Sequence, residues 1–286
     1  MSDAGPVVLG PNQPQRFYQG GARIAAFRGL ARSEAVPADH VPEDWVGSAT
    51  PIFGTAEDGL TRLPDGRLLR DAIDSDPEGY LGPEHVQQYG ASPALLVKLL
   101  DAGERLPVHC HPGDRFARKH LASVWGKTEA WIVVDAAPGS EVHIGFTEAV
   151  PQDMLAGWVA DQDPAMLRAL NRMSVSPGDA ILIPAGLPHA IGEGVFVVEL
   201  QEPTDLSVLL EWEPFPIDGC ADGHLGLGFD LALDCVDRSP WDAGQLAALC
   251  GVPGHSPVAN VFPGAADPYF AAQRIRTGGG AVTLEP

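Results

Sequence analysis

Short runs of hydrophobic residues, each closed by Gly, Pro or another turn residue, fill the middle of the chain. Runs of roughly four to eight such residues predict β-strands, above all where Val, Ile and Leu dominate. We expect strands at residues 94–102, 105–111, 128–136, 141–146, 179–185, 195–201 and 207–212, and a further short strand at 23–27. So many short strands indicate a mainly β protein.

Other segments have helical spacing. Within residues 151–172, Met154, Leu155 and Trp158 lie on one helical face, and Asp163-Pro164 resembles an N-cap followed by Pro at the first helical position. We expect this stretch to be a helical insert between two blocks of strands. Shorter helices are predicted at residues 68–74, 113–121, 230–236 and 242–250.

Together the two patterns predict a jelly-roll β-sandwich or barrel with a helical insertion and helical decoration. We expect three parts. Residues 1–90 should form an N-terminal β-rich segment that packs on the core. Residues 91–235 should form the core with its insert, and residues 236–286 a C-terminal helix with a partial second β-lobe.

The composition narrows the possible partners. The chain has 286 residues, enough for a full hydrophobic core, and a formal net charge of −20. Such a charge repels phosphate backbones, so we expect no nucleic-acid partner. It does not exclude a small anionic substrate, because a few local Arg or Lys residues can hold one phosphate group.

The four Cys residues are scattered and form no C-x-x-C pair, which is typical of a reduced, cytoplasmic protein. The N-terminal residues MSDAGPVVLG have neither a basic start nor an apolar core of the kind found in secretory signals. No stretch approaches the roughly 20 apolar residues that cross a membrane. We therefore expect a cytoplasmic protein with no membrane partner.

Two clusters carry candidate metal ligands. In a strand, residues i and i+2 point to the same face, so His109 and His111 can reach one ion while Cys110 faces away. Glu129, at the start of the next strong strand, can add a carboxylate, and a Pro- and Gly-rich turn presents His189. A lone H-x-H is often a surface feature, but two clusters in this order favour a metal site. The donor set suits Zn²⁺, and also Fe²⁺, Mn²⁺, Ni²⁺ or Co²⁺.

Both clusters resemble the two motifs of the cupin superfamily, except that residues 112–128 separate His111 from Glu129. This spacing, with a helix in the gap, resembles the type I mannose-6-phosphate isomerases. The segments that carry the resemblance are residues 42–48 (PEDWVGS), 108–114 (VHCHPGD), 126–131 (GKTEAW), 177–192 (PGDAILIPAGLPHAIG) and 199–205 (ELQEPTD). It spans about residues 20–235.

The resemblance implies a cupin jelly-roll core and the metal ligands His111, Glu129 and His189, with His109 where the family usually has Gln. It implies one divalent metal ion as cofactor, with Zn²⁺ favoured and Mn²⁺, Fe²⁺, Co²⁺ or Ni²⁺ as the alternatives. The implied reaction interconverts mannose 6-phosphate and fructose 6-phosphate through a cis-enediol, so the implied partner is a small sugar phosphate.

Four further residues are candidates for the site. Lys127 lies two residues before Glu129, hence on the same strand face, and is expected to handle protons or anchor substrate; the alternative is an exposed strand-end cation. A carboxylate within an apolar strand should be paired or functional, so Glu199 is a catalytic candidate unless it faces solvent. Trp45 and Ser48 are expected in the substrate wall, with ordinary packing as the alternative.

Two features depart from the family pattern. The family carries a catalytic Arg ten residues after the Glu that Glu199 matches, and here that position is Leu209, which supplies no cation. Similar proteins also continue with a further β segment where this chain ends at Pro286, so the second lobe is expected to be incomplete.

Other cations could replace the Arg that is missing at position 209. The candidates, for which a solvated surface is the simpler interpretation, are Arg62, Arg67 and Arg70.

These departures leave three functions open. The first is isomerisation of mannose 6-phosphate. The second is a metal cupin that acts on an unphosphorylated sugar, which loss of the Arg would fit. The third is a metal-bearing sugar-binding or regulatory module without turnover.

Overall fold

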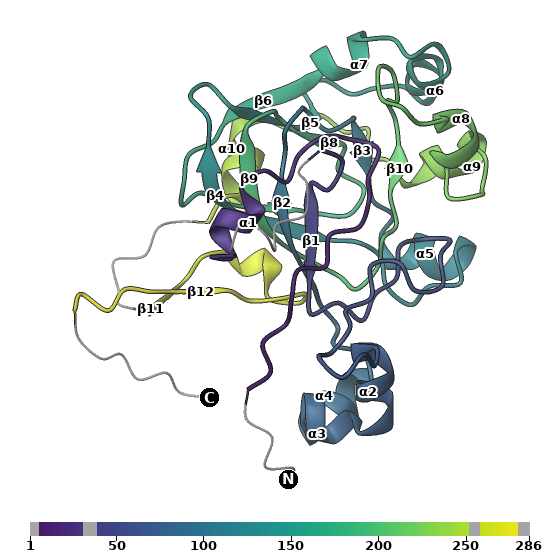
Figure 1. Cartoon of the computed structure of the whole chain (residues 1–286). Helices are drawn as coiled ribbons and strands as arrows, with labels where there is room; N and C mark the ends of the chain where they lie inside the picture. Colours follow the sequence, from purple (N-terminus) through teal and green to yellow (C-terminus); the bar gives the residue numbers. More distant parts are fainter. Residues whose placement is uncertain (1–5, 31–38, 252–257, 280–286) are drawn as a thin grey trace.

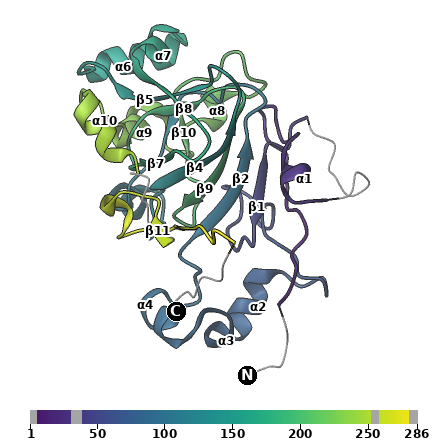
Figure 2. The ribbon, with the colours of Figure 1, turned by 90° about the vertical axis from the view of Figure 1, so that its left-hand side faces the viewer.

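The computed structural model describes residues 6–30, 39–251 and 258–279. Two five-stranded antiparallel sheets face each other and form the core (Figures 1 and 2). The first sheet consists of β1 (Glu43–Val46), β2 (Leu96–Asp101), β9 (Val195–Gln201), β4 (Glu129–Ala136) and β7 (Ala180–Ile183), in that order. The second consists of β10 (Val208–Leu209), β3 (His109–Cys110), β8 (His189–Ile191), β5 (Glu141–Phe146) and β6 (Leu170–Ser174).

The hydrophobic core fills the space between the sheets because strand residues alternate between two faces. Trp131, Val197 and Leu100 from the first sheet pack there against Ile144 and Ile191 from the second. The outer face of the first sheet is also covered: Phe262 and Phe270, near β11 (Val258–Asn260) and β12 (Gln273–Ile275), pack on it. Both faces of that sheet are therefore buried, which explains its nearly continuous apolar runs.

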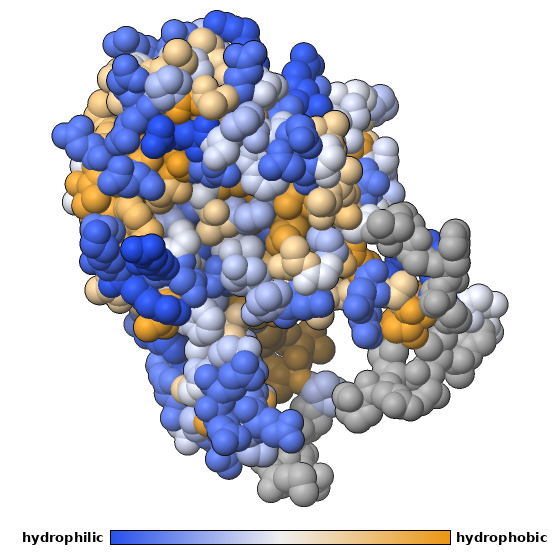
Figure 3. Space-filling model, turned by 180° about the vertical axis from the view of Figure 1, so that it is seen from behind, coloured by the Kyte–Doolittle hydropathy of each residue, from blue (hydrophilic) through white to orange (hydrophobic). Residues whose placement is uncertain are grey.

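Helices cover the outer face of the second sheet and extend below the core. The first group, packed on that sheet, contains α6 (Gln152–Asp161), α7 (Ala165–Arg168) and α9 (Phe229–Ala232), followed by a 3₁₀ turn, η1 (Leu233–Cys235). A lobe of α2 (Leu69–Ser75), α3 (Pro77–Leu81) and α4 (Pro83–Tyr89) lies beyond one end of the sheets (Figure 1). Seen from behind, this lobe is mostly hydrophilic, whereas the body mixes hydrophilic and hydrophobic residues (Figure 3). The remaining short helices are α5 (Asp114–His120), α8 (Gly219–Asp222), α10 (Ala243–Leu249) and η2 (Gly264–Ala266).

The mainly β fold with a helical insertion is confirmed. Each strand expected between residues 94 and 212 is present, although β3 and β10 have only two residues each. The helices expected at 68–74, 113–121, 230–236 and 242–250 are also present, as α2, α5, α9 with η1, and α10. No described helix is long and apolar enough to cross a membrane.

Three expectations were wrong. Residues 23–27 form a helix, α1 (Ile24–Phe27), because one buried residue, Ile24, packs on Leu99 and Phe196 without a strand partner. The helical insert ends before residue 170, since residues 170–174 pair with β5 as β6. Residues 1–90 are not β-rich where the structure describes them, because they hold the single strand β1 and four helices. Residues 280–286 of the expected second lobe lie outside the described residues.

A buried carboxyl fixes the junction between the two central strands. Glu202, just after β9, accepts a hydrogen bond from the Thr128 backbone N–H at 2.7 Å, and its own N–H donates to the Thr128 carbonyl at 3.0 Å. Burial, and the nearby Asp114 carboxylate, raise the pKa of Glu202 from 4.5 to about 7. The side chain is 4% exposed. This contact holds the backbone immediately before Glu129.

The Glu202 carboxyl should make stability depend on pH. Between pH 4.5 and about 7 the unfolded chain loses a proton that the folded chain keeps, so the free energy of unfolding falls as the pH rises. Glu202→Gln removes this titrating group. The free energy of unfolding of the variant, measured relative to that of wild type, should therefore rise by ~1–3 kcal/mol between about pH 5 and about pH 8. Urea unfolding at both pH values measures it, with the exposed Glu148→Gln as the control. Parallel pH profiles for wild type and Glu202→Gln would contradict the assignment.

Candidate metal centre

Three imidazoles gather between the sheets. His109 lies on β3, His111 follows that strand, and His189 opens β8, where the register pairs it directly with His109. The ring centroids are 4.2 Å apart for His109 and His189 and 5.0 Å apart for each pair with His111. One nitrogen from each ring lies within 4.8 Å of the others. The three side chains thus form a cluster that could hold one metal ion.

Backbone carbonyls set the tautomer of each ring. The Nδ1 atoms of His109, His111 and His189 lie 2.9, 2.8 and 2.8 Å from the carbonyl oxygens of Pro107, Leu206 and Leu187. Since a carbonyl only accepts, each Nδ1 carries the proton and each Nε2 keeps its lone pair. This is how histidine ligands are oriented in metal sites.

The cluster also contains a buried nitrogen that the protein leaves unsatisfied. Among the described residues, His189 Nε2 has no hydrogen-bond partner. Leaving such an atom buried is costly unless something binds it. The orphaned lone pair therefore fits a metal ion.

A carboxylate from the opposite sheet faces the imidazoles. Glu129 opens β4, and its oxygens lie 3.0 Å from His111 Nε2 and 3.3 Å from His189 Nε2. Trp131, two residues along the same strand, donates its indole N–H to Glu129 Oε1 at 3.0 Å. The second sheet thus supplies the histidines and the first sheet the carboxylate.

The Lys127 ammonium contacts the same donor atoms. Its Nζ lies 2.9 Å from His111 Nε2 and is bonded to Glu129 Oε2, and Glu199 Oε1 is 3.4 Å away. The side chain is buried, so the exposed alternative is wrong. One lone pair cannot serve two cations, so Lys127 would have to give up His111 when a metal ion binds.

The protonation states match what a metal requires. Burial lowers the pKa of His109 well below its ordinary value, and burial together with the Lys127 charge lowers that of His111 to about 3. Burial opposes ionisation of Glu129, but the Lys127 charge holds its pKa well below the usual range. At neutral pH both of these imidazoles are neutral and the carboxylate is charged, the forms that bind metals.

Glu199 differs from Glu129 in its protonation. It lies mid-strand on β9, with 3% of its surface exposed, so the solvent-facing alternative is wrong. Burial and the Glu129 charge raise its pKa to about 8. Its second oxygen, Oε2, has no hydrogen-bond partner among the described residues. A buried carboxyl that holds its proton near neutral pH is suited to acid–base chemistry.

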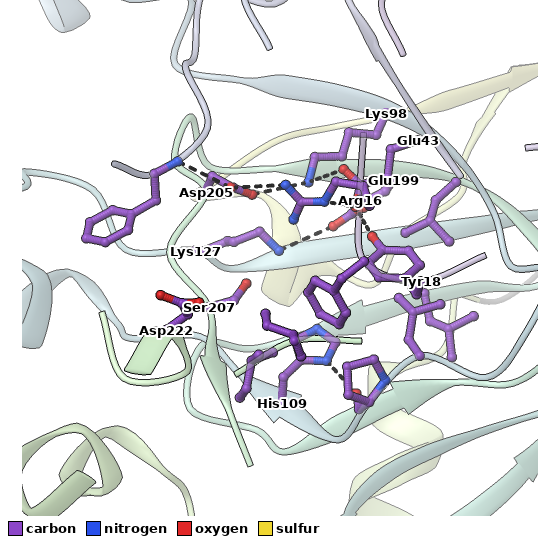
Figure 4. Close-up of a pocket in the computed structure, with 18 of the residues that line it drawn as sticks. Arg16, Tyr18, Glu43, Lys98, His109, Lys127, Glu199, Asp205, Ser207 and Asp222 are labelled. Carbon is purple, nitrogen blue, oxygen red and sulfur yellow. Dashed lines mark hydrogen bonds and ion pairs between the residues drawn. The ribbon is translucent and has the colours of Figure 1, made fainter. Parts of the chain in front are cut away.

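These groups border a cavity of about 260 Å³ (Figure 4). His109, Lys127, Glu129, Glu199 and Leu209 line it, while His111 and His189 are buried and are not among the lining residues. The sequence did not single out several other lining residues, among them Arg16, Tyr18, Glu43, Lys98 and Asp205.

One of these residues, Lys98, could have been predicted from the sequence. Lys98 interrupts the apolar run of β2 just as Glu199 interrupts β9, and the sheet register pairs the two directly. A buried charge in each of two strands should have marked both. Arg16 carried no comparable signal, because it lies in an irregular segment with no periodicity.

The predicted wall residues lie elsewhere. Trp45 is fully buried and does not line the cavity; it donates its indole N–H to Glu43 at 2.6 Å, and its ring packs 4.6 Å from the Lys98 ammonium. Ser48 is buried and bonds to the Thr50 backbone. Trp45 therefore supports the lining residues Glu43 and Lys98 from behind. Arg62, Arg67 and Arg70 are exposed on the surface and do not line the cavity.

Comparison with known proteins places this site in context. No protein-family model matches the chain. Mannose-6-phosphate isomerase ManA of Bacillus subtilis is 34% identical over 209 residues, which cover 72% of this chain and 60% of that protein. The mannose-6-phosphate isomerase of Streptococcus mutans is 32% identical over 174 residues, 59% of this chain and 50% of that protein. The chain spans less than two thirds of the length of the curated relatives it matches.

Solved structures share the fold. The mannose 6-phosphate isomerase of Bacillus subtilis aligns with a TM-score of 0.70 at 23% identity, over 94% of this chain and 79% of that chain. A putative mannosephosphate isomerase from Archaeoglobus fulgidus aligns with a TM-score of 0.66 at 20% identity, over 91% and 79%. In sequence and in fold, the chain is therefore a relative of the type I mannose-6-phosphate isomerases, with a cupin-like mainly β core.

Proposed function

We propose that this chain is a metal-dependent aldose–ketose isomerase that interconverts mannose 6-phosphate and fructose 6-phosphate. The observation that carries the proposal is a cluster of three Nε2 lone pairs and the Glu129 carboxylate at the edge of a cavity that two further buried ionisable groups, Lys127 and Glu199, also line. Relatives named as mannose-6-phosphate isomerases support it.

The four donors His109, His111, His189 and Glu129 would hold the ion. Three imidazoles and a carboxylate favour Zn²⁺ or a similar divalent ion. A solved mannose 6-phosphate isomerase bound with zinc and yttrium has the same fold, with a TM-score of 0.59 at 16% identity over 89% of this chain and 79% of that chain, which supports zinc. When bound, the ion would polarise the sugar oxygens as a Lewis acid.

The chain's own residues would handle the protons. Isomerisation moves a proton between C1 and C2 through a cis-enediol, which needs a group that can both give and take it. Glu199 fits because its pKa of about 8 lies near neutral pH. Burial acts to lower the Lys127 pKa, but Glu129 and Glu199 raise it above its ordinary value, so Lys127 stays charged and can orient Glu199 or a substrate oxygen.

A second candidate is isomerisation of an unphosphorylated sugar at the same metal centre. The observation in its favour is the apolar wall of Leu209, Ile217 and Leu225, which offers no charge to a phosphate. A binding module without turnover is the third candidate. We also infer a cytoplasmic location, which the four free thiols support, and no nucleic-acid partner, which the net charge of −20 supports.

Turnover separates these candidates. Mannose 6-phosphate, supplied with Zn²⁺, Mn²⁺ or Co²⁺ in a coupled assay, should yield fructose 6-phosphate. Free mannose and lyxose in parallel reactions test the second candidate. No fructose 6-phosphate with any of the metals would sink the first. Sugar binding in calorimetry without turnover would favour the third.

His111→Ala should release the metal, because it removes one of the four proposed metal ligands. Metal analysis of the purified protein should show about one equivalent of metal in wild type and a small fraction of that in the variant. His120→Ala, on α5 away from the cluster, serves as the control. A full equivalent retained by His111→Ala would refute this ligand set.

Lys127→Ala should lower turnover far more than metal content. Removing a proton-handling or orienting group typically costs about 100-fold or more in kcat, whereas none of the four proposed ligands is changed. Steady-state rates and metal analysis of the same preparation measure both effects. Wild-type activity in Lys127→Ala would remove this residue from the mechanism.

A further inference from the structure

The cavity has no cation where the family pattern places one. Leu209 lines the cavity from β10, directly beside His109 in the register of the second sheet. An aliphatic side chain there cannot bind an anion. A phosphorylated substrate would need a cation from another part of the chain.

The overall charge of the cavity does not supply the attraction. Three cations (Arg16, Lys98 and Lys127) and five carboxyl groups (Glu43, Glu129, Glu199, Asp205 and Asp222) line it, a formal charge of 3 − 5 = −2 with all five ionised and of 3 − 4 = −1 when Glu199 holds its proton. A bound divalent ion would bring the sum to zero or to +1, depending on the Glu199 proton. An anion must therefore be held by particular donors and not by the net field.

Arg16 has donors to spare. Its side chain is partly buried, with 16% exposed, and it points into the cavity between Lys98 and Asp205, across from His109 (Figure 4). Within the described part of the chain, its guanidinium makes one hydrogen bond, from Nη1 to Asp205 at 3.5 Å, and its buried Nε has none. A guanidinium carries five N–H donors, and leaving them buried and unpaired is costly.

The ion pairs around Arg16 are loose. Arg16 Nε lies 3.4 Å from Glu43, and Lys98 Nζ lies 3.5 Å from Glu43 and 3.9 Å from Asp205. Two cations thus share the same two carboxylates at distances longer than strong charged hydrogen bonds, which are about 2.7–2.9 Å. A purely structural ion pair would be expected to close these distances, so the geometry favours a site that a ligand completes.

The segment that carries Arg16 is pinned on both sides. The Asn12 amide donates to the carbonyls of Trp45 and Gly59, and the Arg16 backbone N–H donates to the His40 carbonyl at 2.9 Å. Gly20 passes so close to β2 that a Cβ would lie 1.9 Å from the Asp101 carbonyl oxygen. The backbone that carries the guanidinium is thus held in place before any ligand arrives, which lowers the entropic cost of binding.

We propose that Arg16, with Lys98 beside it, supplies the cation that Leu209 lacks and binds the phosphate group of the substrate. A planar guanidinium with free N–H donors matches two phosphate oxygens at once. The inference deepens the proposed function and rests on it for the identity of the sugar, whereas anion binding itself can be tested without turnover.

Calorimetry on the metal-loaded protein tests the inference, with inorganic phosphate, fructose 6-phosphate and free fructose as probes. Wild type should bind both phosphates. Arg16→Gln should weaken the binding of both by about tenfold or more and leave free fructose unchanged. Arg62→Gln, an exposed Arg outside the cavity, should match wild type. Arg16→Lys keeps the positive charge but loses the paired N–H donors of the guanidinium, so it should bind fructose 6-phosphate with intermediate affinity. This variant serves as the test if Arg16→Gln does not fold.

Several results would overturn the inference. These are equal affinity of wild type and Arg16→Gln for fructose 6-phosphate, no phosphate binding by wild type, or an equal loss for phosphorylated and free fructose. The outcome is separable from that of the proposed function. Phosphate binding that depends on Arg16, without isomerisation, would sink the isomerase alone. Isomerisation with an unchanged KM for mannose 6-phosphate in Arg16→Gln would sink the role of Arg16 alone.

Discussion

The contact between Glu129 and the imidazoles of His111 and His189 joins the two sheets, and the rest of the site depends on it. A carboxylate buried to this degree is stable only if it is paired and hydrogen-bonded. Trp131 and Lys127 provide hydrogen-bond donors to it, and the Nε2 lone pairs of the histidines face it from the other sheet, so that a cation between them would bind both. Because the donor atoms come from both sheets, the proposed metal site can form only when the sandwich has closed, and metal binding should in turn favour the closed sandwich.

Cations and carboxylates are paired with one another in the cavity. The chain is strongly acidic, yet the three cations in the cavity each lie beside a carboxylate. The two glutamates nearest the metal centre differ in protonation because Glu129 faces the histidines and Lys127, whereas Glu199 is buried beside the Glu129 charge. One carboxylate is thus suited to holding a metal and the other to moving a proton. Environments that push two carboxyl pKa values apart are typical of acid–base sites.

Local rules made the centre of the site predictable. The i and i+2 relation placed His109 and His111 on one side of a strand, and a Pro- and Gly-rich turn marked His189. Glu129 was a candidate because it opens the next apolar strand, the helix before it was predicted from the pattern of residues 113–121, and the family resemblance supported both. Glu199 was recognisable as a charge inside an apolar strand, and Lys98 could have been found in the same way. The fold was predicted where strands were long, and missed where short segments such as α1 and β6 depend on tertiary contacts.

Arg16 could not be predicted, because its place depends on contacts distant in sequence. It meets Asp205 across 189 positions, and its segment is positioned by Asn12 and Gly20 through bonds to other elements. Such contacts leave no periodic pattern in a single sequence.

The central claim is that residues of both sheets form one metal centre. Crystals grown with Zn²⁺ and measured at the zinc absorption edge test it most directly. The account predicts one anomalous peak at about 2.0–2.2 Å from Glu129 and from the Nε2 atoms of His109, His111 and His189. A peak bound elsewhere, or no peak among these four side chains at saturating zinc, would contradict it.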